Sequence, residues 1–295
     1  MYGPVLSALF LGMVPLWGIG APAHPSAPLL TVAPPARADG TQMLAALIEP
    51  APPRAQILSA SAVLVIDIQS GQKLFGRDVD VPRPMASLTK QMTALLIVEK
   101  FGHALDTEMT VAAEAAGAEG NAVGLAMGDR FTRGDLLTAV LVASANDAAT
   151  ALAIEHSGSV SAFVEQMNVR AAELGLRDTV FVNPTGLDAP GQHSTPQDLA
   201  WLAMFALRYP QVVDRMGSRS AEIHSLAGKS ITLSHTHALL HTAPDVLAGK
   251  TGTTDRAGQC LLSLVSEGGR KYLVVLLQSN DRYRDMRAIL DALRA

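Results

Sequence analysis

The fold is decided by two neighbouring stretches, AVLVIDIQSGQKLFG at residues 62–76 and SLTKQMTALLIVEKF at residues 87–101. The first is rich in β-branched residues and contains turn-forming residues at 67–71, which predicts a β-hairpin. The second repeats apolar residues at helical spacing and is followed by Gly102, which predicts a helix that begins at Ser87.

Helical patterns dominate the next part of the chain, and strand patterns return near its end. Residues 105–215 read as mostly helical, whereas strands are expected after Glu222, at 230–234, 258–265 and 272–278. A last helix is expected at 285–293, with its apolar face packed on the sheet rather than on a membrane. We therefore predict an α/β (α+β) fold: an antiparallel sheet built from both ends of the sequence, flanked by helices, with an inserted helical lobe.

The N-terminal region reads as an export signal followed by a linker. Residues 5–19 are almost wholly apolar, and small-x-small sites follow at 21–23 and 36–38, although no Lys or Arg precedes the apolar run. Prolines concentrate in residues 21–53, which favours extended chain over a packed core. The expected organisation is a signal peptide at 1–38, a Pro-rich linker at 39–54 and a catalytic domain at 55–295. That domain is expected to divide into a helical lobe at about 87–215 and a sheet lobe at about 55–86 and 216–295.

Composition limits the function classes. The 295 residues are 48% hydrophobic and carry a formal net charge of −4, so the chain can bury a large core and offers no electrostatic case for nucleic acid. Cys260 is the single cysteine, which excludes an internal disulfide and a multi-cysteine metal site. The apolar run at the N-terminus is shorter than a membrane span and contains Pro15, so a membrane anchor is not evident.

Ser87 and Lys90 form the first motif that could carry chemistry. Residues three apart share a helix face, so the two side chains can touch. A serine hydroxyl becomes a good nucleophile only when a base takes its proton, and a buried lysine can be neutral enough to be that base. A capping serine with a solvated lysine would have the same spacing.

Two further motifs lie far along the chain. Ser144-Ala145-Asn146 stands between two helical patterns and offers a hydroxyl for proton relay and an amide for a substrate carbonyl. Lys250, Thr251, Gly252 and Thr253 are expected at the start of a strand, where glycine permits close backbone approach. Lys250 and Thr251 can recognise a carboxylate, and the Thr253 amide can donate to an oxyanion.

Together, in this order, the three motifs resemble those of the penicillin-recognising serine enzymes. Within that group the chain resembles the low-molecular-mass penicillin-binding proteins of the D-alanyl-D-alanine carboxypeptidase family. The resemblance covers roughly residues 60–290 and includes FVNPTGL at 181–187 and HSTPQDL at 193–199. It implies a β-lactamase/transpeptidase-like fold and a secreted or periplasmic enzyme of cell-wall peptidoglycan.

The resemblance also implies roles for single residues. Ser87 would be the acylated nucleophile, Lys90 its general base and Ser144 a proton shuttle to the leaving amine. The substrate would be a peptidoglycan stem peptide, with β-lactam antibiotics as inhibitors. Substrate-binding positions would be Asn146, Lys250, Thr251, Gly252, Thr253 and, by a looser alignment, Arg284.

No metal or other cofactor is expected. His235, His237 and His241 are close in sequence, but a strand passes into a loop there, so they do not share one face. We expect a surface or supporting role for them rather than metal ligation.

Several functions remain open within this interpretation. An endopeptidase acting on D-alanyl cross-links would use the same motifs as a carboxypeptidase. A β-lactamase of the same fold would need an element such as Glu-x-x-x-Asn between Asn146 and Lys250 to activate water, and no convincing one is found. An inactive peptidoglycan-binding module is disfavoured by the intact motifs.

Overall fold

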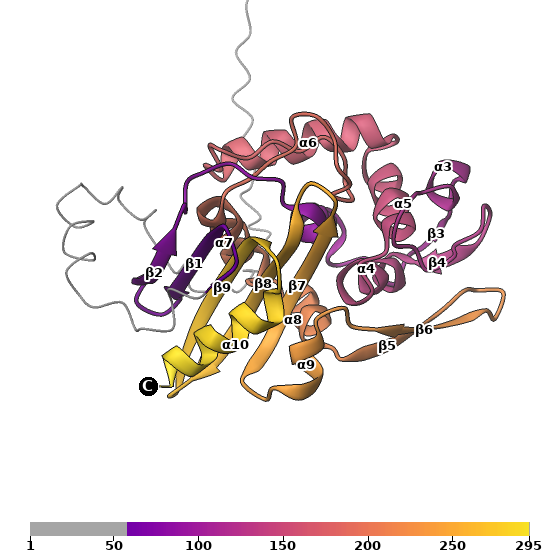
Figure 1. Cartoon of the computed structure of the whole chain (residues 1–295). Coiled ribbons are helices and arrows are strands. Elements are labelled where there is room, and N and C mark those ends of the chain that lie inside the picture. Colours follow the sequence, from indigo (N-terminus) through magenta and orange to yellow (C-terminus); the bar gives the residue numbers. More distant parts are fainter. Residues whose placement is uncertain (1–57, 295) are drawn as a thin grey trace, which may run out of the picture. The chain divides into compact units, whose positions relative to one another are not determined.

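A computed structural model describes residues 58–294. Its centre is one five-stranded sheet of order β2-β1-β9-β8-β7, in which every neighbouring pair is antiparallel. The strands are β1 (Ala62–Asp67), β2 (Lys73–Arg77), β7 (Val246–Thr254), β8 (Gly258–Glu267) and β9 (Arg270–Ser279). Strand β1 lies beside β9, so the first and last parts of the described chain meet in the sheet (Figure 1). This confirms the predicted antiparallel sheet built from both ends of the sequence.

Helices and two small two-stranded sheets fill the sequence between β2 and β7 (Figure 1). The helical elements are the 3-10 turn η2 (Ala86–Thr89), α2 (Lys90–Phe101), α3 (Ala113–Ala116), α4 (Arg133–Val142), α5 (Asn146–Ser157), α6 (Val160–Glu173), α7 (Pro196–Ala206), α8 (Pro210–Gly217) and α9 (Ala238–Thr242). One small sheet pairs β3 (Glu108–Thr110) with β4 (Arg130–Thr132), and the other is a hairpin of β5 (Ser220–His224) and β6 (Ser230–Ser234).

The helix that begins with the serine motif is central to the core. Every residue of α2 from Lys90 to Val98 is buried, which is typical of a helix surrounded by protein on all sides. Met92 and Leu95 of this helix belong to the same apolar cluster as Leu64 and Val275 of the sheet. The helix is therefore a rigid support, and its first residue is a lysine with no access to water.

The opposite face of the sheet is covered by the C-terminal helix α10 (Arg282–Leu293) (Figure 1). Met286, Ile289 and Leu290 are buried there in one cluster with Val63 and Leu276 of the sheet. This confirms that the apolar face of α10 packs on the sheet. Within residues 58–294, no helix is long and apolar enough to cross a membrane.

Three local expectations are corrected. The region read as mostly helical contains the small sheet of β3 and β4, whose three-residue strands are too short to show an alternating pattern. The helix expected from Ser87 begins with the tighter turn η2 and becomes α-helical at Lys90. The Lys-Thr-Gly motif lies toward the end of β7 rather than at its start.

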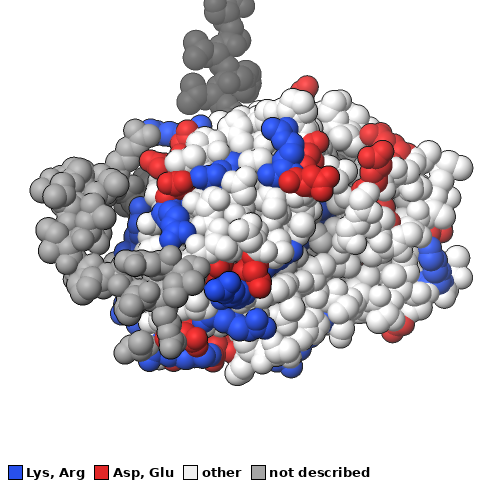
Figure 2. All heavy atoms as spheres, viewed as in Figure 1, with Lys and Arg blue, Asp and Glu red and all other residues white. Residues whose placement is uncertain are grey.

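The predicted signal peptide at 1–38 and linker at 39–54 lie outside the described residues. The division of the catalytic domain into lobes at about residue 87 and residue 215 stays a prediction. On the face that carries α10, Figure 2 shows positively and negatively charged side chains mixed together, with few charges over α9 and the β5–β6 hairpin.

Candidate active site

Ser87 lies in the turn η2, on a backbone that is held in an unusual conformation. Ala86, directly before it, has a φ of 47°, in the left-handed region, which costs a residue with a Cβ about 1–2 kcal/mol. Two glycines allow the close contacts that hold this turn. A Cβ on Gly186 would lie 2.1 Å from Ala86 O, and a Cβ on Gly252 would lie 2.8 Å from Ser87 N. The Ser87 backbone is thus fixed between two glycine-containing segments.

Lys90 is fully buried directly beneath this serine. Its Nζ lies 3.1 Å from Ser87 Oγ, 2.6 Å from Asn146 Oδ1 and 2.5 Å from the carbonyl oxygen of Thr185. Burial holds the pKa of Lys90 well below its usual range, and the nearby Lys250 lowers this pKa further, whereas Asp147 raises it. Burial and the positive charge of Lys250 thus favour the neutral form of the amine.

The three partners of Lys90 suit a neutral amine. Asn146 Oδ1 and Thr185 O can only accept hydrogen bonds, so each takes one N–H of the amine. The lone pair of the amine is then left for the hydroxyl proton of Ser87. This arrangement can remove a proton from Ser87 without any other base.

Ser144 stands between α4 and α5 and also has a left-handed backbone, with a φ of 61°. Lys250 Nζ donates to Ser144 Oγ at 2.7 Å and to Thr251 O at 2.9 Å. Lys250 is fully buried, and burial together with the charge of Arg282 lowers its pKa to about 7. A second serine–lysine pair therefore faces the first, with a lysine that can still carry a proton near neutral pH.

Asn146 opens α5 and is fixed at both ends of its side chain. Its Oδ1 accepts from Lys90, and its Nδ2 donates to Glu119 O at 2.7 Å. The backbone N–H of Asn146 donates to Asn121 O at 2.7 Å. The second hydrogen of Nδ2 remains for a substrate carbonyl.

The end of β7 forms the side of the site opposite Ser144. Thr251 Oγ1 donates to Thr236 Oγ1 at 2.6 Å, and Gly252 lies against the Ser87 turn. Thr253 is exposed, and its hydroxyl accepts from the guanidinium of Arg282. These residues come together with Ser87, Lys90, Ser144 and Asn146 in one site.

Arg284 does not join them. It is exposed, and its backbone N–H donates to Asp281 Oδ1 at 3.0 Å. Arg282 lies at β7 instead, where its Nη1 donates to Gly252 O at 2.8 Å and to Cys260 O at 2.9 Å. Residues two apart on a helix are turned about 200° from each other, so only one of the two arginines can face the sheet. An arginine directly after the helix-capping Asp281 is the signal that could have selected Arg282.

Two of the three histidines near β7, His235 and His237, are buried, whereas His241 is exposed. His237 is fully buried and its Nε2 lies 2.7 Å from Ser263 Oγ, while its backbone N–H donates to Nδ1 of the buried His235. His241 Nε2 lies 3.0 Å from His235 O. In the described part of the chain, no group of three potential ligand side chains is placed to hold a metal ion.

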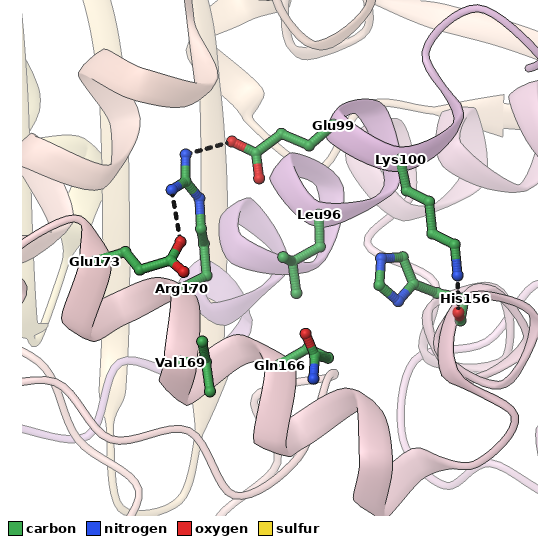
Figure 3. A pocket seen from close by; sticks show the side chains of 8 residues that line it. All are labelled: Leu96, Glu99, Lys100, His156, Gln166, Val169, Arg170 and Glu173. Atoms are coloured by element: carbon green, nitrogen blue, oxygen red, sulfur yellow. Dashed lines mark hydrogen bonds and ion pairs between the residues drawn. The ribbon is translucent and has the colours of Figure 1, made fainter. Parts of the chain in front are cut away.

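A cavity of about 320 Å³ lies between α2, α5 and α6, and none of the motif residues lines it (Figure 3). Arg170 lies at one end of it, with ion pairs to Glu99 at 2.7 Å and to Glu173 at 2.8 Å, and Leu96 of α2 and Val169 of α6 also line it. Its arginine is paired with both glutamates, and the remaining charged lining residue, Lys100, donates to His156 O. We therefore assign this cavity to the packing of α2 against α6.

The three motifs thus meet in the order and on the element types of serine enzymes that combine Ser-x-x-Lys, Ser-x-Asn and Lys-Thr-Gly. Residues 48–281 match the peptidase family described as D-alanyl-D-alanine carboxypeptidase, and the chain belongs to this family.

Individual relatives agree with this assignment. The chain is 32% identical over 220 residues to the D-alanyl-D-alanine carboxypeptidase DacF of Bacillus subtilis, covering 74% of this chain and 57% of that protein. It is 30% identical over 235 residues to a D-alanyl-D-alanine endopeptidase of Pseudomonas aeruginosa, covering 78% and 75%. A solved D-alanyl-D-alanine carboxypeptidase of Mycobacterium tuberculosis superposes with a TM-score of 0.74 at 31% identity, covering 80% of this chain and 90% of that one.

Proposed function

We propose that the protein is a serine peptidase that cleaves D-alanyl-D-alanine bonds in peptidoglycan stem peptides through an acyl-enzyme on Ser87. The observation that carries this proposal is the position of the Lys90 amine. It is buried, it contacts the acceptors Asn146 Oδ1 and Thr185 O, and it lies 3.1 Å from Ser87 Oγ, from which the neutral amine can take the hydroxyl proton. Family membership supports the substrate class.

In the acylation step, Ser87 Oγ attacks the carbonyl carbon of the penultimate D-alanine while Lys90 takes the hydroxyl proton. The backbone N–H groups of Ser87 and Thr253 stabilise the oxyanion. The C–N bond then breaks, and the proton taken up by Lys90 passes through Ser144 to the departing amine of the terminal D-alanine. Water subsequently attacks the ester while the neutral Lys90 accepts its proton, and this proton passes to Ser87 Oγ as the ester C–O bond breaks.

The terminal carboxylate of the substrate is proposed to bind at the end of β7. Lys250 and Arg282 supply positive charge, and Thr251 and Thr253 supply hydroxyl donors. The lack of a side chain at Gly252 permits this arrangement, because a Cβ there would clash with the Ser87 turn. Asn146 orients the acyl side of the peptide through its remaining amide hydrogen.

An endopeptidase acting on D-alanyl cross-links is the second candidate. The match with this chain covers 75% of the Pseudomonas aeruginosa relative that bears this name, against 57% of the Bacillus relative. The same acyl-enzyme chemistry applies, with the leaving amine on a cross-linked peptide. β-Lactams are proposed to act as inhibitors, because their leaving group stays tethered after ring opening and obstructs the water.

We also propose that the protein acts outside the cytoplasm, in the periplasm or after secretion, because its substrate lies there. The apolar run at 5–19 supports a signal at 1–38 followed by a linker at 39–54. Residues 55–295 would form the catalytic domain, with its helical lobe at about 87–215.

The test uses fluorescent penicillin and a defined peptide that ends in D-Ala-D-Ala. Wild-type protein is expected to be labelled and to release D-alanine, whereas Ser87→Ala should do neither. Ser161→Ala, a change of an α6 surface serine, should behave as wild type. Hydrolysis of penicillin should be slower than peptide cleavage by roughly a thousandfold, which is about 4 kcal/mol in barrier height.

Labelling of Ser87→Ala at the wild-type rate would refute the nucleophile. Fast penicillin hydrolysis without peptide cleavage would make the protein a β-lactamase. Cleavage of cross-linked peptides into their separate stem peptides, without release of D-alanine from the D-Ala-D-Ala peptide, would identify the endopeptidase.

A further inference from the structure

Asp147, the second residue of α5, is a carboxylate with only 1% exposure. Its Oδ2 accepts the backbone N–H groups of Val123, Gly124 and Leu125, each at 3.0 Å, and its Oδ1 accepts that of Ala148 at 2.9 Å. A buried carboxylate is stable only where such donors replace its hydration. The three successive amides of one loop therefore converge on a single oxygen.

The same loop also fixes Asn146. Glu119 O accepts from the side-chain amide of Asn146, and Asn121 O accepts from its backbone N–H, each at 2.7 Å. A Cβ on Gly120 would lie 2.8 Å from Asn146 Nδ2, so the contact is close. The orientation of the Asn146 amide is thus set by the loop.

The loop depends on a special backbone conformation as well as on the carboxylate. Gly124 has a φ of 78°, and a Cβ there would meet nothing within 4 Å. A side chain at this position would therefore act through the left-handed backbone alone and not through a clash. This gives a way to disturb the loop without changing any charge.

We propose that Asp147 is a positioning residue, which holds residues 119–125 against α5 so that the Asn146 amide stays between Glu119 O and Lys90 Nζ. The inference rests on the proposed function, because Asn146 and Lys90 are taken there as groups of the reaction. The role differs from that of Asn146, since Asp147 is enclosed by backbone amides and is not open to a substrate.

A second consequence concerns the charge of Asp147. The charged groups that influence Lys90 are Lys250 from β7, which lowers the pKa of Lys90, and Asp147 from α5, which raises it. Removal of the carboxylate charge should lower the pKa of Lys90 further. The acid limb of the acylation rate, where Lys90 gains a proton, should then move to lower pH.

The test is the variant Asp147→Asn, which keeps the shape of the side chain but turns an amide toward three N–H donors. Acylation by a β-lactam should slow by about 10²-fold, as expected for a misplaced catalytic group, and its acid limb should move to lower pH. Amide hydrogens of residues 123–125 should exchange faster than in wild type.

Asp67→Asn is the matched control. Asp67 is another carboxylate with 1% exposure that accepts backbone N–H groups, from Gln69 at 2.9 Å and from Ser70 at 3.2 Å, but it lies in the β1–β2 turn. This control should lower the melting temperature and leave the acylation rate per folded molecule and its acid limb unchanged. The same result for Asp147→Asn would overturn the inference.

If Asp147→Asn does not fold, the variant Gly124→Val tests whether the loop at 119–125 positions Asn146. It should slow acylation and leave the acid limb in place, because the carboxylate charge is intact. A wild-type rate in this variant would overturn the inference. If wild-type protein is not acylated at all, the proposed function fails, and hydrogen exchange at 123–125 still tests the contact of Asp147 with the loop.

Discussion

At the scale of single residues, the candidate site contains two fully buried lysines whose pKa values are both lowered. Lys90 contacts Ser87, and Lys250 contacts Ser144. Burial removes the hydration of both amines, and the positive charge of Lys250 additionally lowers the pKa of Lys90. The pKa of Lys90 lies well below its usual range, and the pKa of Lys250 is about 7. The lowered pKa of Lys90 suits its proposed role as a base, and a pKa of about 7 lets Lys250 carry a positive charge below that pH.

The pKa of Lys250 predicts how substrate binding depends on pH. Lys250 is protonated below about pH 7 and loses its positive charge above that value. The KM for a peptide that ends in a free D-Ala carboxylate should therefore rise as the pH increases through 7. Steady-state kinetics between pH 6 and 9 measure this, with the C-terminal amide of the same peptide as control. An identical pH profile for both peptides would contradict the role of Lys250 in carboxylate binding.

The sequence indicated some of these residues and could not indicate others. The three-residue spacing of Ser87 and Lys90 predicts contact on one helix face, and the structure has it. The backbone carbonyl oxygens of Glu119 and Thr185 accept from Asn146 and Lys90. They could not be predicted from the sequence, because every residue type has a backbone carbonyl. Choosing Arg282 over Arg284 required the start of α10 to be known to within one residue.

At the scale of elements, the meeting of η2 with the end of β7 creates the site. Ala86 takes a left-handed backbone and Gly252 lacks a Cβ, so the turn and the strand can approach closely. The sequence predicted the contact-permitting glycine but placed its motif at the start of the strand. The first half of β7 was missed because it contains Ala248 and Gly249, which are residue types depleted in strands.

The packing of α10 on the sheet leads to a stability prediction. Leu290 is 3% exposed in the cluster that joins α10 to β8 and β9. Leu290→Ala should lower the free energy of unfolding by about 2–5 kcal/mol, because it removes buried apolar contacts and leaves a cavity. Urea denaturation measures this, with Arg287→Ala on the exposed face as control. Equal stability of the two variants would argue against tight packing of α10.

At the scale of the whole molecule, the proposed catalytic and substrate-binding residues come from segments that are far apart in the chain. Ser87 and Lys90 follow the first hairpin, Ser144 and Asn146 lie among the helices, and Lys250 is on the third strand of the sheet to appear in sequence. The sequence predicted that the sheet is built from both ends, because apolar strand patterns occur only there, and the pairing of β1 with β9 confirms it. The contact of the loop at 119–125 with α5 could not be predicted, since it depends on a buried carboxylate and on backbone amides.

The buried histidines affect the stability of the whole fold toward acid. Burial is the main cause that lowers the pKa of His156 to about 4, of His235 to about 3 and of His237 to about 4. The unfolded chain takes up these protons near pH 6.5. Between pH 6.5 and 4 the unfolded state therefore binds more protons than the folded state, and the free energy of unfolding should fall as the pH falls.

For His237 alone, a shift from 6.5 to about 4 corresponds to a loss on the order of 3 kcal/mol. Asp67 and Asp129, whose pKa values are lowered below 3.8, lose their contribution to stability only at more acidic pH, so the histidine effect occurs in a separate pH range.

Urea denaturation at pH 7.5, 5.5 and 4.5 should show the decrease in the free energy of unfolding. His237→Gln should be less stable at pH 7.5, because the imidazole packed on Gly249 and held by Ser263 is lost. It should nevertheless lose less stability than wild type on acidification, since glutamine takes up no proton. A wild-type free energy of unfolding that stays constant from pH 7.5 to 4.5 would show that these imidazoles are protonated in the folded protein.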